Sequence, residues 1–141
     1  MRHRLPLVAG AALLLAAAGG FSLLVGGDDT EKTAAGAPMA RVAVPELAGV
    51  AARGRDLFDG ACAVCHGENA AGRAGIAPPL VHVIYEPAHH ADGAFLLAIA
   101  RGVRQHHWSF GDMPAVPDVT QQDVAAIIAY VRALQRANGI Y

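Results

Sequence analysis

The five residues Cys62-Ala63-Val64-Cys65-His66 limit what this chain can fold into more than any other stretch of the sequence. They form a C-x-x-C-H pattern, which is the attachment signature for a haem group. Each thiol can add across one haem vinyl group, and two intervening residues let one tight turn bring both sulfurs to the same porphyrin edge. The next residue, His66, can then reach the iron as its proximal ligand. The motif therefore predicts covalent attachment through Cys62 and Cys65.

A C-x-x-C pair on its own has two other interpretations, a redox dithiol and one half of a zinc site. The chain contains two cysteines in all, so a second cysteine pair for a structural zinc site is missing. A thioredoxin-like dithiol would accompany a βαβ pattern, and the sequence shows none. Haem attachment is the favoured interpretation of the motif.

Residues 1–27 have the pattern of a membrane anchor or a signal sequence. Arg2 and Arg4 precede residues 5–27, a run without any charged side chain that is long enough to span a bilayer. A cleavage site at Ala16-Ala17-Ala18 is the alternative, but cleavage there would expose the apolar residues 21–25 on the mature protein. We therefore expect an uncleaved anchor, and under either interpretation the rest of the chain is exported.

Composition divides the remaining chain in two. Residues 28–44 are rich in Ala, Gly and charged side chains without a helical or alternating pattern, so they are expected to form a flexible linker. Residues 45–141 are expected to form one small globular domain. The net charge of −1 and the lack of a basic patch argue against binding of nucleic acid.

Helical periodicity dominates this domain, and no segment shows strong strand alternation, so the predicted fold class is all-α. A first helix is expected over 45–60, with Gly54 either a weak point or a place where another helix approaches closely. A second is expected over 92–101, with Asp92 as its N-cap. The last should begin with a capping box of Thr120 and Asp123 and end before Gly139.

A sixth ligand for the iron is sought in the loop before the last helix. Met113, between Gly111 and Pro114, is the best candidate, because a thioether is a soft, neutral ligand that raises the reduction potential. The alternatives are that Met113 only fills a gap in the core, or that His106 or His107 is the ligand.

The domain resembles the bacterial class I c-type cytochromes, which are monohaem electron carriers. The resemblance covers about residues 45–137. It rests on Gly54 and Phe58, the C-x-x-C-H motif, Pro78 and Leu80, Met113-Pro114, and Ile127 with Tyr130. The resemblance implies a cytochrome c fold in which the first and last helices cross at Gly54, Phe58, Ile127 and Tyr130. It also implies that the Pro78 carbonyl accepts a hydrogen bond from the proximal histidine and that Leu80 packs near the haem.

The expected function is one-electron transfer by a single c-type haem, with His66 and Met113 as axial ligands. The protein is expected to be an electron carrier rather than an enzyme, in the periplasm at a bacterial inner membrane or soluble there after cleavage. Its expected partners are redox proteins such as a membrane oxidase, reductase or dehydrogenase, or a respiratory complex of which it is the haem subunit. The alternative is a five-coordinate haem sensor or a peroxidase-like enzyme.

Two histidine pairs, His89-His90 and His106-His107, depart from the pattern of that family. They could approach each other and bind a transition metal such as copper, since imidazole suits these ions. Ordinary loop histidines without a metal are the favoured interpretation, because pairs so far apart follow no metal-ligand spacing. Trp108, next to the second pair, is expected either near a haem propionate or in the core.

Overall fold

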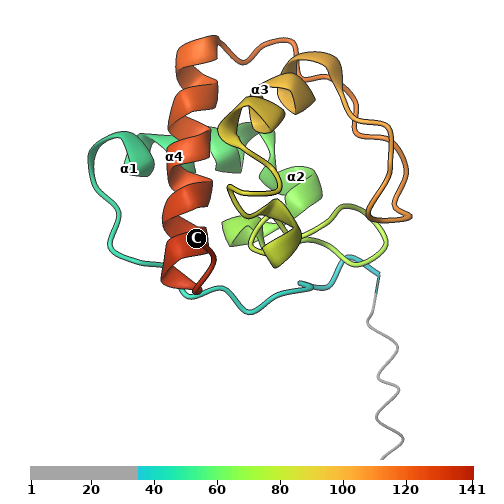
Figure 1. Cartoon of the computed structure of the whole chain (residues 1–141), viewed down its shortest axis with the longest axis horizontal. Helices are drawn as coiled ribbons and strands as arrows, with labels where there is room; N and C mark the ends of the chain where they lie inside the picture. The colour runs from blue at the N-terminus through green and yellow to red at the C-terminus, as the bar shows by residue number, and fades with distance from the viewer. Residues whose placement is uncertain (1–34) are drawn as a thin grey trace, which may run out of the picture. The chain divides into compact units, whose positions relative to one another are not determined.

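The computed structural model describes residues 35–141, which form a mostly helical domain (Figure 1). Neither strands nor a helix long and apolar enough to cross a membrane occur among these residues. The expected anchor over residues 1–27 lies outside the described part of the chain. In order, the elements are α1 (Gly49–Ala61), α2 (Ala63–His66), the 3-10 turns η1 (Glu68–Ala70) and η2 (Val83–Tyr85), α3 (Asp92–Arg101) and α4 (Gln121–Ala137).

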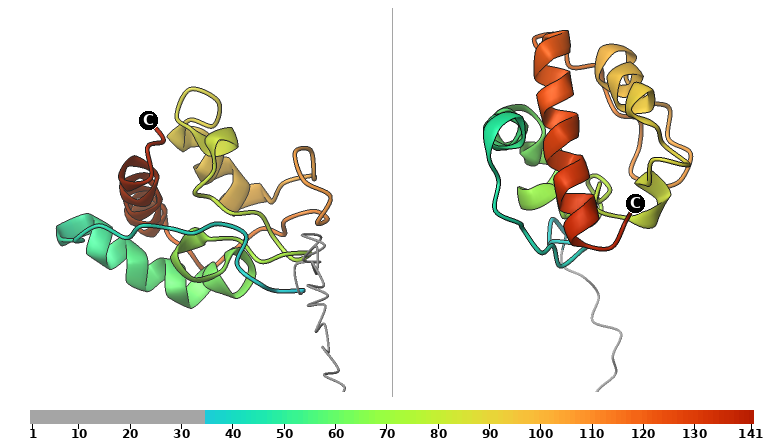
Figure 2. Two further views of the ribbon diagram at one scale, coloured as in Figure 1. Left: turned by 90° about the horizontal axis from the view of Figure 1, so that it is seen from below. Right: turned by 60° about the vertical axis from the view of Figure 1, so that its left-hand side comes forward.

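Helix α4 is the element against which the other long helices pack. Helix α1 crosses it on one face and α3 packs against another, as the two views of Figure 2 show. The capping box predicted for its first turn is present, because Thr120 accepts from the Asp123 N–H and the Asp123 carboxylate accepts from the Thr120 N–H. The helix ends at Ala137, and Gly139 follows in a left-handed conformation, as expected of a stop signal.

The crossing of α1 and α4 depends on Gly54. A Cβ atom at this position would lie 1.9 Å from the Ala126 carbonyl oxygen, so only glycine lets the two backbones come this close. One turn further along α1, the ring of Phe58 packs edge-to-face on Tyr130, with 5.5 Å between ring centroids. Both aromatic side chains are completely buried. The helix contact at Gly54, one of the two alternatives left open by the sequence, is therefore confirmed.

The start of α1 differs from the prediction. The sequence pattern predicts a helix from Pro45, whereas α1 begins at Gly49 after an extended residue, Ala48. The non-helical residues before Gly49 include Val42 and Leu47, which pack against the core cluster around Phe58, a contact that the helical pattern does not take into account. Gly49 has a positive φ of 56°, a conformation that glycine adopts without steric cost.

Helix α3 has the predicted bounds, but its N-cap is Ala91 and not Asp92. The Asp92 carboxylate instead accepts a hydrogen bond of 2.8 Å from Nε of Arg132, a buried residue of α4. The same guanidinium donates to the carbonyl oxygens of Tyr85 and His90 and lies over the ring of Phe95. A buried charge needs such partners, so Asp92 serves the Arg132 contact rather than the helix end.

Part of the expected linker is attached to the domain. Backbone hydrogen bonds join Gly36 and Ala37 to Ala74, and Met39 and Ala40 to Ala71. Further along, Ala43 exchanges two hydrogen bonds of 2.9 Å with the side chain of Asn138, just after α4. Residues 36–43 thus lie against the globular body, because their backbone polar groups find partners there that composition does not reveal.

Candidate functional site

The three residues of the C-x-x-C-H motif that carry chemistry lie on one helical turn. Helix α1 ends at Ala61, Cys62 forms the junction, and α2 carries Cys65 and His66. The Cys62 carbonyl oxygen accepts hydrogen bonds from the N–H groups of Cys65 and His66, at 3.1 and 2.9 Å. Cys62 is half-buried, Cys65 is exposed, and both are free thiols. The backbone thus holds two unpaired sulfurs and an imidazole within a single turn.

His66 is held by the loop that follows it. Its Nδ1–H donates to the Pro78 carbonyl oxygen at 2.9 Å, and the side chain is buried. This bond fixes the tautomer in which Nε2 carries a lone pair for a metal. Burial lowers the pKa of His66, while the bond to Pro78 opposes this shift, and the imidazole is therefore neutral near pH 7.

The thiol of Cys62 is also affected by its surroundings. Burial raises its pKa to about 11, and the nearby Cys65 adds to the shift. Near pH 7 this thiol is therefore protonated. A neutral thiol that added across a haem vinyl group would form the thioether with no net change in protons, since its hydrogen would end on the neighbouring carbon.

The loop between His66 and Pro78 folds back on itself through close backbone contacts. The Gly72 N–H donates to the His66 carbonyl oxygen at 2.7 Å, and Gly72 has a positive φ of 75°. A Cβ atom at Gly72 would lie 2.5 Å from the Pro79 nitrogen. Leu80, two residues beyond Pro78, packs against the core cluster around Phe58 and Tyr130. Glycine at position 72 thereby brings the prolyl carbonyl to the histidine.

Met113 is fixed by its backbone. Its N–H donates to Val103 O and its carbonyl accepts from Val103 N–H, both at 2.9 Å. The side chain is half-buried and packs against a second core cluster of Ile99, Val124 and Ile128. The alternative ligands, His106 and His107, are placed differently. Their side chains are exposed, and their ring centroids lie 4.4 Å apart.

Two residues contribute to this region in ways that the motif did not indicate. The Arg73 guanidinium donates to the Val64 carbonyl oxygen inside the C-x-x-C-H turn. The indole Nε1–H of Trp108 is buried and has no hydrogen-bond partner among residues 35–141, and the ring lies against His82 and Phe110. A buried donor of this kind suits an acidic group such as a haem propionate. No sequence signal distinguishes Arg73 from an ordinary loop arginine.

Together these residues fit a haem group: two free thiols on one turn, a neutral histidine with an available Nε2, and a buried unpartnered donor. The fold and the site therefore define a small helical protein built to hold haem covalently.

Comparison with family models identifies the family. The Cytochrome c model matches residues 51–135, which is more than half of the chain, so this protein belongs to the cytochrome c family. A comparison with curated proteins found no match. Membership implies a covalently bound c-type haem and haem-based electron transfer, as the motif predicted.

Proposed function

We propose that this protein is a class I monohaem cytochrome c that carries single electrons between redox proteins. In this proposal Cys62 and Cys65 form the two thioethers, and His66 and Met113 occupy the axial positions. The observation that carries it is the hydrogen bond from His66 Nδ1–H to the Pro78 carbonyl oxygen. This bond leaves Nε2 of His66 free to bind the iron, and His66 directly follows the second cysteine, Cys65.

When bound, the haem supplies one-electron chemistry, its iron alternating between the ferrous and ferric states. The protein's residues determine how readily this occurs. The Pro78 carbonyl orients the His66 ring and increases its basicity, while a thioether from Met113 favours ferrous iron. The apolar clusters behind Leu80 and Met113 keep water away and so limit the reorganisation that accompanies a change of charge.

A five-coordinate sensor or peroxidase-like enzyme is the less favoured function. It would need an open distal position, whereas Met113 is placed by two backbone hydrogen bonds and offers a ligand of the kind found in electron-transfer cytochromes. The family match likewise fits an electron carrier.

We further propose that the domain works in the periplasm of a bacterium, tethered to the inner membrane by residues 1–27. The support is the uncharged run over residues 5–27 behind Arg2 and Arg4. Its partners would then be a membrane oxidase, reductase or dehydrogenase, or the other subunits of a respiratory complex.

Covalent attachment is tested by extraction in acidified acetone. Haem is expected to remain with the polypeptide, because two thioethers survive denaturation. Cys62→Ala and Cys65→Ala should each lower the yield of mature haem protein severely. Val64→Ala is the matched control, because this exposed side chain between the cysteines carries no proposed role, and its yield should be normal. Loss of haem into the organic phase from the parent protein would disprove attachment.

Localisation is tested by fractionating cells that produce the full chain. The protein should stay with membranes after a high-salt wash, and its mature N-terminal sequence should retain residues 5–27, since an apolar span resists extraction by salt. Recovery in the soluble periplasmic fraction with an N-terminus near Gly19 would show that the segment is a cleaved signal.

A further inference from the structure

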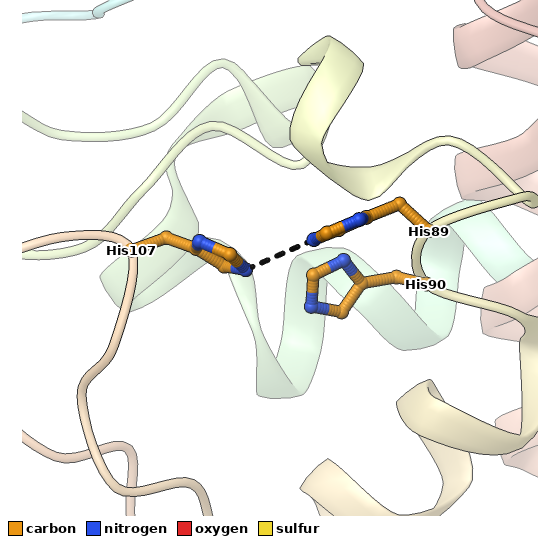
Figure 3. A group of neighbouring side chains, drawn as sticks. All are labelled: His89, His90 and His107. Atoms are coloured by element: carbon orange, nitrogen blue, oxygen red, sulfur yellow. Dashed lines mark hydrogen bonds between the residues drawn. The ribbon is translucent and has the colours of Figure 1, made fainter.

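Two loops that are remote from each other in sequence bring four histidines together at the surface. His89 and His90 follow η2, while His106 and His107 lie in the loop between α3 and α4. One ring nitrogen each from His89, His90 and His107 lies within 4.8 Å of the others. Figure 3 shows the three side chains pointing toward one another. Nε2 of His89 lies 3.3 Å from Nε2 of His107. The structure therefore shows that the two histidine pairs approach each other, which is the first half of the metal-site hypothesis.

We propose that His89, His90 and His107 bind a divalent transition-metal ion, with copper held more tightly than zinc. Imidazole nitrogen is a good ligand for both ions, and the affinity order of first-row metals places Cu²⁺ above Zn²⁺. This site shares no residue with the proposed haem ligands. It would therefore be a second metal centre in the domain.

The spacing of the ring nitrogens supports a single bound ion. Nitrogens that ligate one ion at about 2.0–2.1 Å in tetrahedral geometry are about 3.4 Å apart. The His89 and His107 nitrogens, at 3.3 Å, already have this spacing. His89 and His107 are exposed, so their side chains can rotate to bring the third nitrogen closer without disturbing the core.

The third ligand is held in place by the protein. His90 Nδ1–H donates to the Ile84 carbonyl oxygen at 2.6 Å, which leaves Nε2 with a lone pair for a metal. A backbone carbonyl behind a ligating histidine is a usual arrangement in metal sites, because it fixes the tautomer and the ring orientation. The backbone of His90 is fixed as well, since its N–H donates to the Glu86 carbonyl oxygen and its own carbonyl accepts from buried Arg132.

His106 is close to the three, but it is not in the group of histidines whose ring nitrogens lie within 4.8 Å of one another. Its Nδ1 bonds to the Arg104 carbonyl oxygen within its own loop, and its ring stacks 6.0 Å from that of His90. It therefore provides a matched control, being an exposed histidine of the same loop that is not among the proposed ligands.

Binding is tested on the full-length, haem-containing ferric protein. The background carries His3→Ala, so that this histidine outside the proposed site does not contribute to copper binding. Titration with CuCl₂ and then ZnCl₂ by calorimetry should show one ion per chain, with Cu²⁺ the tighter. The Cu²⁺ paramagnetic resonance spectrum should show coupling to imidazole nitrogens. Absence of a one-to-one binding step for both ions would refute the site.

Variants then identify the ligands. His89→Ala with His107→Ala should weaken Cu²⁺ binding by more than the ~10–100-fold that is lost when only an outer partner of a ligand is removed. His106→Ala should keep one-to-one binding with nearly the parent affinity. Unchanged affinity in the double variant, or an equal loss in His106→Ala, would overturn the assignment. An unchanged haem absorption spectrum and metal-free melting temperature would show that each variant is folded, so these outcomes are independent of the proposed electron-carrier function.

Discussion

Replacing Met113 by alanine is expected to lower the midpoint potential by on the order of 100 mV or more, within the ~0.8 V range over which axial ligands tune haem proteins. Under the proposed ligation, loss of the Met113 thioether would remove the ligand that favours ferrous iron and would open the sixth position. The variant should therefore bind carbon monoxide, which the parent should not. It should also lose the weak near-infrared band from sulfur to ferric iron that is expected of this family. Potentiometric titration and absorption spectroscopy measure these changes.

The control for this experiment is supplied by the neighbouring histidines. His106→Ala and His107→Ala should keep the parent's low-spin spectrum and potential, because both side chains are exposed and lie beside other histidines. If Met113→Ala kept the parent spectrum while one of these variants lost it, the iron would have two histidine ligands. Met113→Leu adds a second check, since it preserves apolar packing against Ile99 and Val124 but cannot ligate the iron.

Replacing Gly54 by alanine is expected to destabilise the domain by about 3 kcal/mol or more, at or beyond the upper end of ordinary overpacking. The added Cβ would meet the Ala126 carbonyl oxygen at 1.9 Å, and backbone cannot rotate away as a side chain can. Helices α1 and α4 would have to separate, which also breaks the packing of Phe58 on Tyr130. Since a small domain is stable by only about 5–15 kcal/mol, thermal unfolding followed by circular dichroism should show a large loss.

Gly60 is the matched control on the same helix. Nothing lies within 4 Å of a Cβ built at Gly60, so Gly60→Ala meets no obstacle. Because alanine is a better helix former than glycine, this variant should be as stable as the parent or more stable by up to about 1 kcal/mol. Equal stability of Gly54→Ala and Gly60→Ala would show that the close approach of α1 and α4 does not restrict position 54 to glycine.

The features that were predictable from sequence are those determined by local chemistry. The capping box of Thr120 and Asp123 and the bounds of α3 depend on residues within a few positions of each other, and the structure has both. The close approach at Gly54 could be suspected because glycine inside an amphipathic helix is costly unless something needs the space. Haem attachment could be predicted from the C-x-x-C-H motif for the same reason, since the residues that it needs lie within five consecutive positions.

Features that depend on distant partners could not be predicted. Aspartate is a residue type favoured at the N-cap, but the carboxylate of Asp92 accepts a hydrogen bond from Arg132, which is 40 residues away in sequence. The sequence contains no spacing rule that brings His89 and His107 together, because their approach depends on how two loops pack. The attachment of residues 36–43 also escapes pattern analysis, since it is made by backbone hydrogen bonds that any residue type except proline could form.

The pair of hydrogen bonds between Val103 and Met113 has a consequence for how this protein can change over evolutionary time. These bonds close residues 104–112 into a loop whose two ends are fixed, while most of its side chains are exposed. Insertions at the exposed positions of the loop would alter its outer face and leave the backbone pairing of Val103 with Met113 in place, because each doubling of loop length costs only about 0.6 kcal/mol. Exposed positions of this loop such as His106 and His107 can therefore change without shifting Met113, the proposed axial ligand, whereas Trp108 in the same loop carries the buried donor that suits a haem propionate.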